Sequence, residues 1–339
     1  MSRINFHALT DRTLSCRIGP MNYIVLDLEW NQAQEAWDER NKLLTFEIIE
    51  IGAVKLNSRM EILDTYHELI KPQVYDKMHH VTEKLIQIHM EELERCRSFD
   101  QVMKDFLEWC GDGYIFGTWG TQDLTELQRN MQFFGMGALS SGPFRFYDIQ
   151  KLFSLSYEDG KSRRSLECAA DFLHFEKDIP FHRALSDAYY TARVLQQIKD
   201  PRALQHFSYD TFTLPTSYRD EVHVVFEDYA KYISRAFPDK EMLMTDREVI
   251  STKCYLCHRN LRKKIRWFSP NGKHYFSVSY CDKHGYMKGK IRIKKAEDDR
   301  VYAVKTTKFI SAAESEAIWK KKEHAKQLRK EKRSRERST

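Results

Sequence analysis

Two acidic residues interrupt an apolar segment near the start of the chain. Asp27 and Glu29 fall within residues 23–29 (YIVLDLE), whose other side chains are typical of a buried β-strand. Residues two positions apart on a strand project from the same face, and two adjacent carboxylates repel each other unless a cation lies between them. The pair is therefore predicted either to lie at a solvated strand end or to bind a metal ion.

Two further segments add an imidazole and two carboxylates. Asp123 follows Gly120 at the start of a predicted helix, where an acid is also a routine helix cap. His182 and Asp187 are five residues apart, and inside one helix they would point roughly 140° away from each other. To serve one site, His182 must precede the helix and Asp187 must lie within it, and Pro180 favours such a loop. The alternative is a surface histidine and a solvent-facing aspartate.

The elements that must position these side chains form an α/β domain between residues 21 and 200. Three closely spaced strands suit an antiparallel meander, and strands and helices then alternate. The site exists only if this fold brings acids that are far apart in the sequence to one place. The predicted strands are 23–29, 47–56, 61–69, 114–119 and 144–149, and helices are predicted within 82–109, 123–134, 165–173 and 184–198.

In the order Asp-x-Glu, Asp, His-x4-Asp, these segments resemble the DEDDh exonucleases, the group of ribonuclease T, the DnaQ-like proofreading exonucleases and oligoribonuclease. The resemblance spans residues 21 to about 199. The second motif, Trp119-Gly120-x2-Asp123, is similar to that of the Eri-1/KapD-like branch, whose better-known members act on RNA. The resemblance implies a ribonuclease H-like mixed sheet, antiparallel in its first strands and then parallel, with helices on its flanks.

The resemblance also implies a two-metal-ion hydrolysis of single-stranded nucleic acid from its 3′ end, releasing nucleoside 5′-monophosphates. Asp27, Glu29, Asp123 and Asp187 would hold two Mg²⁺ or Mn²⁺ ions, with Asp27 between them, and His182 would be the general base. RNA is favoured as substrate, although no residue distinguishes ribose from deoxyribose. The alternatives are an exonuclease that acts on DNA and a non-catalytic nucleic-acid-binding protein with a decayed nuclease domain.

Two tryptophans lie beside the acidic motifs. Trp30 follows Glu29, where many relatives carry threonine or another small residue, and Trp119 precedes Gly120. Each could stack on the terminal nucleotide of the substrate or could pack into the core. Core packing is favoured, because tryptophans are usually largely buried.

A second set of metal-binding residue types lies towards the C-terminus. Two chelating pairs, Cys254-x2-Cys257 and Cys281-x2-His284, flank a predicted strand-turn-strand segment with Asn271-Gly272 at its tip. Two such pairs meet the requirements of tetrahedral Zn²⁺ and resemble a zinc ribbon of the Cys₃His type. Four protein ligands leave no position for a reacting group, so one structural Zn²⁺ is predicted.

The fourth ligand is less certain than the three cysteines, because His258 and His274 are nearby substitutes. The alternative is a fortuitous cluster of free thiols. The remaining four cysteines are scattered, which is not the pattern of a disulfide framework.

Charge is distributed unevenly along the chain. The net charge is +6, but residues 251–339 contain 26 Lys and Arg against 9 Asp and Glu, a net of +17, which leaves −11 for residues 1–250. Lysines and arginines are interleaved with aromatic residues around the cysteine pairs, a combination used to bind single-stranded nucleic acid. The alternative is a solvated basic tail.

Composition narrows the class of protein. No window approaches the roughly 18 apolar residues of a membrane span, and residues 1–20 lack the apolar stretch of a signal peptide. The cysteine usage fits a reducing compartment, so a cytoplasmic protein without a membrane partner is predicted. The predicted divisions are a disordered leader or a segment preceding a true start at Met21 (1–20), the exonuclease domain (21–200), a helical connector with a helix over 220–236 (201–250), a basic zinc-ribbon-like module (251–311) and a basic helical or disordered tail (312–339).

Overall fold

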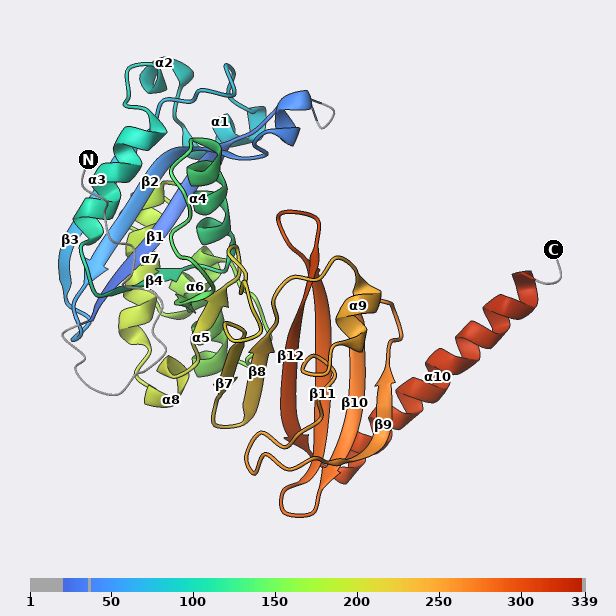
Figure 1. Cartoon of the computed structure of the whole chain (residues 1–339). Coiled ribbons are helices and arrows are strands. Elements are labelled where there is room, and N and C mark those ends of the chain that lie inside the picture. Colours follow the sequence, from blue (N-terminus) through green and yellow to red (C-terminus); the bar gives the residue numbers. More distant parts are fainter. Residues whose placement is uncertain (1–20, 36–37, 337–339) are drawn as a thin grey trace. The chain divides into compact units, whose positions relative to one another are not determined.

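The computed structural model of the chain describes residues 21–35 and 38–336 (Figure 1). The chain divides into two compact units, residues 1–213 and 214–339. The prediction made for residues 1–20 lies outside the described residues.

The first unit is built on a mixed sheet of six strands. Its order is β3-β2-β1-β4-β5-β6. The first three strands are antiparallel, β4 and β5 continue parallel to β1, and β6 closes the far edge antiparallel to β5. The predicted antiparallel-then-parallel sheet is therefore confirmed. The strands are β1 (Asn22–Asn31), β2 (Glu47–Leu56), β3 (Ile62–Leu69), β4 (Tyr114–Thr118), β5 (Phe144–Asp148) and β6 (Ser208–Asp210).

Helices cover both faces of this sheet. The apolar side chains of α3 and α4 pack with Ile24, Leu26 and Leu28 on one face, and those of α5, α6 and α7 pack with Val25 and Val54 on the other. The segment 82–109, predicted as helical, is divided among three helices. The helices are η2 (Glu39–Lys42), α1 (His80–Ile86), α2 (Met90–Leu93), α3 (Phe99–Cys110), α4 (Gln122–Phe133), α5 (Ile149–Tyr157), α6 (Leu166–Phe172), α7 (Ala184–Gln197) and α8 (Pro201–Leu204).

The second unit is an antiparallel sheet of six strands in the order β7-β8-β12-β11-β10-β9. On one face, α9 and its flanking loops pack on Tyr232, Ile291 and Ala303. On the other face, α10 packs through Ile318 against Phe276 and its neighbours. The elements are β7 (Val222–Val225), β8 (Tyr229–Ile233), α9 (Lys240–Thr245), β9 (Arg262–Phe268), β10 (His274–Cys281), β11 (Gly285–Lys295), β12 (Val301–Ile310) and α10 (Ala312–Glu336).

The helix predicted over residues 220–236 is wrong. The structure has the strands β7 and β8 in this segment, paired with each other and, through β8, with β12. Valine and tyrosine favour a pleated, half-buried surface, and pairing with a strand much later in the chain overrides the local helical spacing. The second sheet therefore begins well before residue 251.

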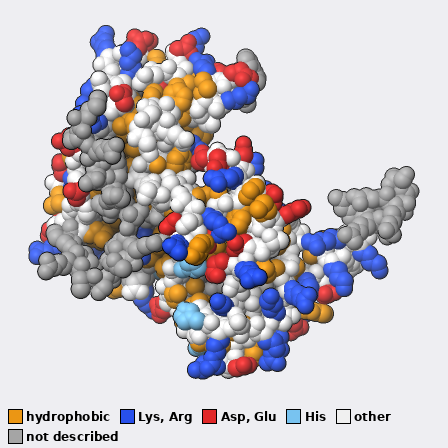
Figure 2. All heavy atoms as spheres, viewed as in Figure 1, with side chains coloured by type: hydrophobic (Ala, Val, Ile, Leu, Met, Phe, Trp, Pro, Cys, Tyr) orange, Lys and Arg blue, Asp and Glu red, His pale blue; other side chains and the backbone are white. Residues whose placement is uncertain are grey.

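The basic C-terminal segment contains the long helix α10, one of the two states predicted for it. Figure 2 shows many Lys and Arg side chains over the visible surface of the C-terminal unit. Among the described residues, no helix combines the length and the apolar character needed to cross a membrane.

Candidate functional site

The alternation of β1 places Asp27 and Glu29 on the sheet face that α7 covers. Ile24, Leu26 and Leu28 point into the opposite core, so the intervening positions share the face of Val25. Across the antiparallel pair, Asp27 lies opposite Gly52 and Glu29 lies opposite Glu50. The two carboxylates therefore project side by side from the middle of the sheet.

Helix α7 reaches this pair because Gly52 has no side chain. A Cβ atom at Gly52 would lie 2.1 Å from the backbone nitrogen of Leu185 and 2.2 Å from the carbonyl carbon of Ala184. The first turn of α7 thus rests directly on the backbone of β2, next to Asp27. This close approach carries Asp187, in the same turn, to the two acids of β1.

Asp27, Glu29 and Asp187 converge. Each offers a carboxylate oxygen, and these atoms all lie within 4.8 Å of one another. Oδ2 of Asp187 accepts a hydrogen bond from the backbone N–H of His182 at 3.3 Å, whereas the buried Oδ1 has no hydrogen-bond partner among the described residues. An unpaired buried carboxylate oxygen is costly, and a bound cation would satisfy it.

Asp123 approaches the group from the first turn of α4. It is buried, and it is not one of the three acids within 4.8 Å. Helix α4 begins just after β4, which runs parallel to β1 and pairs Gly117 with Val25. The carboxyl ends of the two parallel strands therefore bring Asp123 towards the acidic group from the side opposite α7.

The four acids repel one another, and the pKa of each is raised. Burial and then the carboxylates of Asp123, Asp187 and Glu29 raise the pKa of Asp27 well above its usual value. Burial, followed by Asp187, raises the pKa of Glu29 to about 8. Burial also raises the pKa of Asp123 to about 7 and that of Asp187 to about 6.

These acids fit a hard divalent cation. All their donor atoms are anionic oxygens, the ligands that Mg²⁺ and Mn²⁺ prefer. Repulsion among clustered carboxylates and the unpartnered Oδ1 of Asp187 are both relieved by positive charge at their centre. The chemistry of the donor set thus matches a divalent metal.

His182 lies in the loop before α7, at an exposed position. Its backbone has a φ of 64°, in the left-handed region that few histidines adopt. Arg183 follows as the N-cap of α7, so Asp187 is one turn inside the helix. The loop-then-helix arrangement that a shared site requires is present.

A hydrogen-bonded ion pair beside the acids was not predicted from the sequence. Glu50, with no exposed side-chain surface, accepts hydrogen bonds from Nε of Arg183 at 3.1 and 3.2 Å, and Nε2 of His67 lies 2.7 Å from its Oε1. Burial opposes the charge of Glu50, but the hydrogen bonds from His67 and Arg183 outweigh it and hold its pKa below the usual value. The sequence contains one sign of this pair, because Glu50 is an acid within the otherwise apolar segment 48–54.

The two tryptophans pack against the cores. Trp30 is half-buried with its ring centroid 5.5 Å from that of Phe46. The indole N–H of Trp119 donates to the carbonyl of Arg164 at 3.2 Å, and its ring contacts Phe153. Contact of either ring with a substrate stays a prediction.

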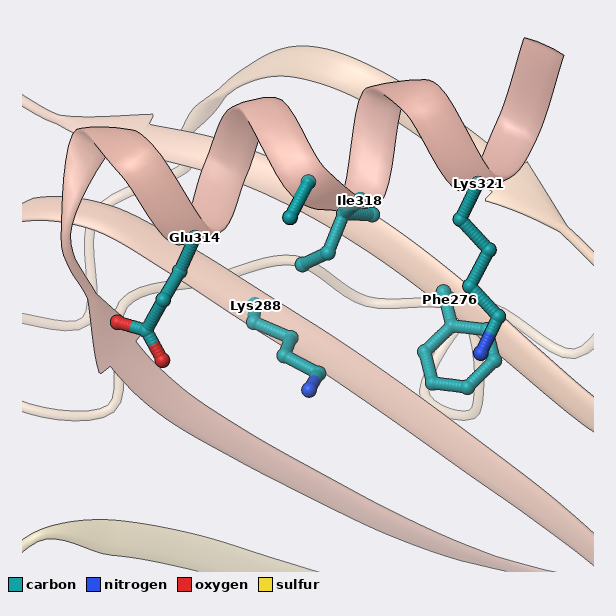
Figure 3. A pocket seen from close by; sticks show the side chains of 6 residues that line it. Phe276, Lys288, Glu314, Ile318 and Lys321 are labelled. Atoms are coloured by element: carbon teal, nitrogen blue, oxygen red, sulfur yellow. The ribbon is translucent and has the colours of Figure 1, made fainter. Parts of the chain in front are cut away.

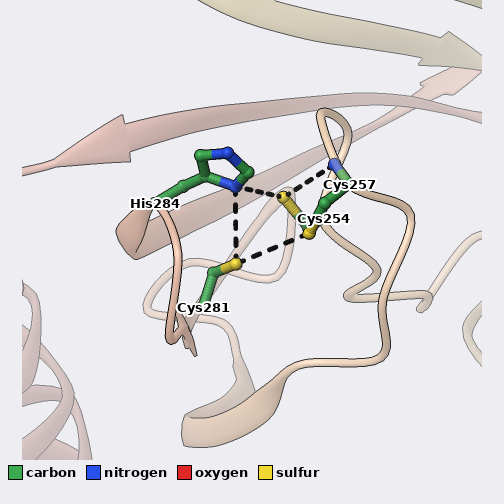
Figure 4. Close-up of side chains that lie close together, drawn as sticks. All are labelled: Cys254, Cys257, Cys281 and His284. Atoms are coloured by element: carbon green, nitrogen blue, oxygen red, sulfur yellow. Dashed lines mark hydrogen bonds between the residues drawn. The ribbon is translucent and has the colours of Figure 1, made fainter.

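In the second unit, Cys254, Cys257, Cys281 and His284 form one cluster, with all four ligand atoms within 4.8 Å of one another (Figure 4). Sγ of Cys257 and Sγ of Cys281 are 3.7 Å apart, and Nδ1 of His284 is 3.4 Å from Sγ of Cys254. Two sulfurs bound tetrahedrally to one zinc ion would be about 3.8 Å apart, given Zn–S bonds of about 2.3 Å. The cluster therefore fits zinc.

The fold and the acidic site point to the exonuclease family. Residues 24–195, about half of the chain, match the family model described as RNase_T exonuclease, and the chain belongs to that family. All five residues of the DEDDh pattern lie within the matched segment.

Among characterised proteins, the chain is similar to 3′-5′ exoribonuclease 1 of Rattus norvegicus, with 24% identity over 159 residues that cover 44% of this chain and 45% of the relative. The same enzyme of Homo sapiens is 25% identical over 161 residues, with the same coverage. DNA polymerase III PolC-type of Staphylococcus aureus is 23% identical over 188 residues, 54% of this chain and 12% of the polymerase. The chain thus spans less than half the length of these relatives.

Two solved nuclease structures are similar to this chain. The nuclease domain of 3′hExo, a DEDDh family member bound to rAMP, is 22% identical and covers 57% of this chain and 98% of its own, with a TM-score of 0.46. The cell-death related nuclease 4 (CRN-4) is 14% identical and covers 66% of this chain and 70% of its own, with a TM-score of 0.45.

Proposed function

We propose that this protein is a 3′→5′ exonuclease that removes nucleoside 5′-monophosphates from single-stranded nucleic acid, with RNA preferred to DNA. The convergence of Asp27, Glu29 and Asp187 within 4.8 Å, with Asp123 beside them, carries the proposal. Membership of the exonuclease family supports the reaction, and the relative named as an exoribonuclease supports the preference for RNA.

The four acids are proposed to hold two Mg²⁺ or Mn²⁺ ions. Repulsion among all four acids supports a cation at their centre, and the family resemblance places Asp27 between the ions. When bound, such ions neutralise the phosphate and lower the pKa of a water molecule. The carboxylates themselves orient the scissile phosphate by fixing the cations against the sheet.

His182 is proposed as the general base that takes the proton of the attacking water. Its imidazole lies on an exposed loop, and the backbone N–H of His182 donates a hydrogen bond to Oδ2 of Asp187 at 3.3 Å. A histidine side chain can take up and release a proton, which suits a general base.

The C-terminal unit is proposed to hold one structural Zn²⁺ through Cys254, Cys257, Cys281 and His284 and to bind the nucleic acid through its basic surface. A cytoplasmic location is also proposed. It is supported by the cysteines among the described residues, none of which forms a disulfide.

Release of mononucleotides from a 3′-labelled oligoribonucleotide tests the active site. With the purified full-length chain and Mn²⁺, His182→Ala and Asp187→Ala should each reduce the rate at least a hundredfold, while circular dichroism stays unchanged. His174→Ala is a matched control, because His174 is also exposed and has a φ of 56°. Undiminished activity in either site variant would remove the assignment.

Turnover of RNA and DNA oligomers of one sequence tests the substrate. Faster release from RNA is expected. Faster release from DNA would make the protein a DNA-directed exonuclease. Binding without release from either polymer would leave a non-catalytic nucleic-acid-binding protein.

A further inference from the structure

One face of the C-terminal sheet carries a row of cations. Along β11, Met287, Gly289 and Ile291 are buried on one side, so the alternate residues project from the other. From residue 288 to residue 294, these alternate residues are all basic. The cation row consists of Lys288, Lys290, Arg292 and Lys294.

Three of the four cations in the row have no acidic partner among the described residues. Within the described part of the chain, Lys290, Arg292 and Lys294 form no ion pair. Burial, followed by the neighbouring charge of Lys290, lowers the pKa of Lys288, and Lys321 and Lys308 act in the same direction. Like charges are thus gathered on this face, where an anionic ligand would relieve their repulsion.

A cavity of about 230 Å³ opens at one end of the cation row, between α10 and the sheet (Figure 3). Phe276 and Ile318 supply its apolar walls, and Lys288 and Lys321 flank it. The ammonium nitrogens of Lys321 and Lys288 lie 4.3 and 5.8 Å from the ring centroid of Phe276. The cavity is smaller than the roughly 300–1,000 Å³ sites of drug-sized ligands and therefore suits one small planar group.

The carboxylate at the cavity, that of Glu314, has another partner. Its Oε2 accepts a hydrogen bond from the backbone N–H of Ser311 at 2.9 Å, and Oγ of Ser311 accepts one from the backbone N–H of Glu314. This reciprocal pair caps α10. Glu314 also attracts Lys288, but the cations around the cavity outnumber it.

We propose that this face binds single-stranded nucleic acid, with phosphates along the cation row and one base in the cavity beside Phe276. An apolar slot next to a line of cations matches a chain in which every anionic group is accompanied by a planar ring. An acidic peptide supplies the charges without the rings. The inference takes its ligand class from the proposed function, but it does not require the chain to cleave that ligand.

Fluorescence anisotropy tests the cation row. The full-length chain with Asp187→Ala, which prevents cleavage under the proposed mechanism, is titrated into a labelled oligouridylate of about 15 nucleotides. Adding Lys290→Ala and Arg292→Ala should weaken binding at least tenfold and reduce the slope of log affinity against log salt by about 1.4. The control is Lys240→Ala with Arg247→Ala, which removes two exposed cations from the side of the sheet that α9 covers.

Equal weakening by the two double variants would show attraction by net charge alone and would overturn the proposal. An unchanged affinity in both would also overturn it. If an oligoglutamate peptide binds as tightly as the oligonucleotide and loses affinity with the same variant, the face is a docking surface for acidic proteins instead. Each of these experiments measures binding. The results can therefore be interpreted even if the protein proves not to be an exonuclease.

A second variant tests the cavity. Ala317 is an exposed residue of α10 that lines the cavity, so Ala317→Leu should partly fill it without a change of charge. We expect at least threefold weaker binding of the oligouridylate and no change in binding of inorganic polyphosphate, which has no bases. Ala313→Leu, on the same helix outside the cavity, should change neither. Equal effects of Ala317→Leu on both polymers, or on neither, would remove the base site.

Discussion

Nε of Arg183 donates hydrogen bonds to both carboxylate oxygens of Glu50, at 3.1 and 3.2 Å, and this buried pair ties β2 to the residue that follows His182. Glu50 also lies opposite Glu29 across the sheet. The pair thus connects the strand beside the acidic group to the loop that carries the proposed base. Residues that orient a site from behind it typically change activity by 10–100-fold when altered.

Glu50→Gln should lower kcat for mononucleotide release by at least about tenfold with little change in KM, because the neutral amide holds Arg183, and through it the His182 loop, less firmly. Glu68→Gln is the matched control. Glu68 lies on the adjacent strand β3 and pairs with Arg97 at 2.8 Å, but both side chains are partly exposed. The loss of such a pair costs about 0–1 kcal/mol and should leave kcat unchanged. Equal kcat values for Glu50→Gln and the unmodified protein would contradict a positioning role.

Gly52→Ala should damage both stability and activity. The added Cβ would lie 2.1 Å from the backbone nitrogen of Leu185, so α7 must shift away from β2 and carry Asp187 with it. Overpacking of this kind costs about 1–3 kcal/mol, which a chemical denaturation curve measures. Gly142→Ala is the control, because a Cβ there meets nothing within 4 Å. A fully active Gly52→Ala protein would show that the close approach is not needed.

The acidic group should be a source of instability until a cation binds. In protein dialysed free of Mg²⁺ and Mn²⁺, Asp187→Asn should raise the Tm, because it removes one of the mutually repelling carboxylates. Addition of Mn²⁺ should raise the Tm of the unmodified protein by the linkage of binding to folding and should leave that of Asp187→Asn nearly unchanged. An equal response of both proteins to Mn²⁺ would exclude metal binding by this group.

Cys281→Ser should remove one equivalent of zinc and unfold the second unit, because structural zinc sites contribute free energy of folding directly. Elemental analysis and circular dichroism measure the two effects. Cys168→Ser is the control, since Cys168 is exposed and lies outside the cluster. Retention of zinc by Cys281→Ser would exclude Cys281 as a ligand.

Lys305 gives the second unit a characteristic dependence on pH. It is buried, its ammonium donates to the carbonyl of Glu248 at 2.6 Å, and burial lowers its pKa to about 8. Between about pH 8 and the unfolded value near 10.5, the unfolded chain holds more protons, so stability should rise with pH. The full gain is at most roughly 3 kcal/mol.

Denaturation curves of the unmodified protein and Lys305→Met at pH 7.5 and 9.5 isolate this effect. The change with pH should be smaller in the variant, because the other titrating groups are common to both proteins. Identical pH dependence would show that Lys305 keeps its ordinary pKa in the folded state.

The acids of β1 could be predicted from the sequence because each interrupts an apolar strand. The strand of residues 47–56 was also predictable, since residues 48–54 are apolar except for Glu50. The partner of Glu50 was not predictable, because Arg183 is far away in the sequence and only the packing of α7 on Gly52 joins them. Local residue types reveal a candidate ligand, but not the group that orients it.

The error at residues 220–236 has a related cause. The spacing of apolar residues there is compatible with a helix, and what decides for a strand is pairing with β12. Likewise, the position of Asp123 in the sequence is compatible with a metal ligand and with a helix cap, and its burial beside the other acids favours the ligand.

The position of β12 between β8 and β11 has a consequence for synthesis on the ribosome. The first unit has all its strands once residue 210 has emerged, whereas the second sheet stays split into two pieces until residues 301–310 follow. Until then, β8 and β11 each expose an unpaired edge, which is the feature of a nascent chain that invites intermolecular pairing. A ribosome that stalls before residue 301 therefore carries a first unit that can fold and an incomplete second sheet whose exposed edges can pair with other chains.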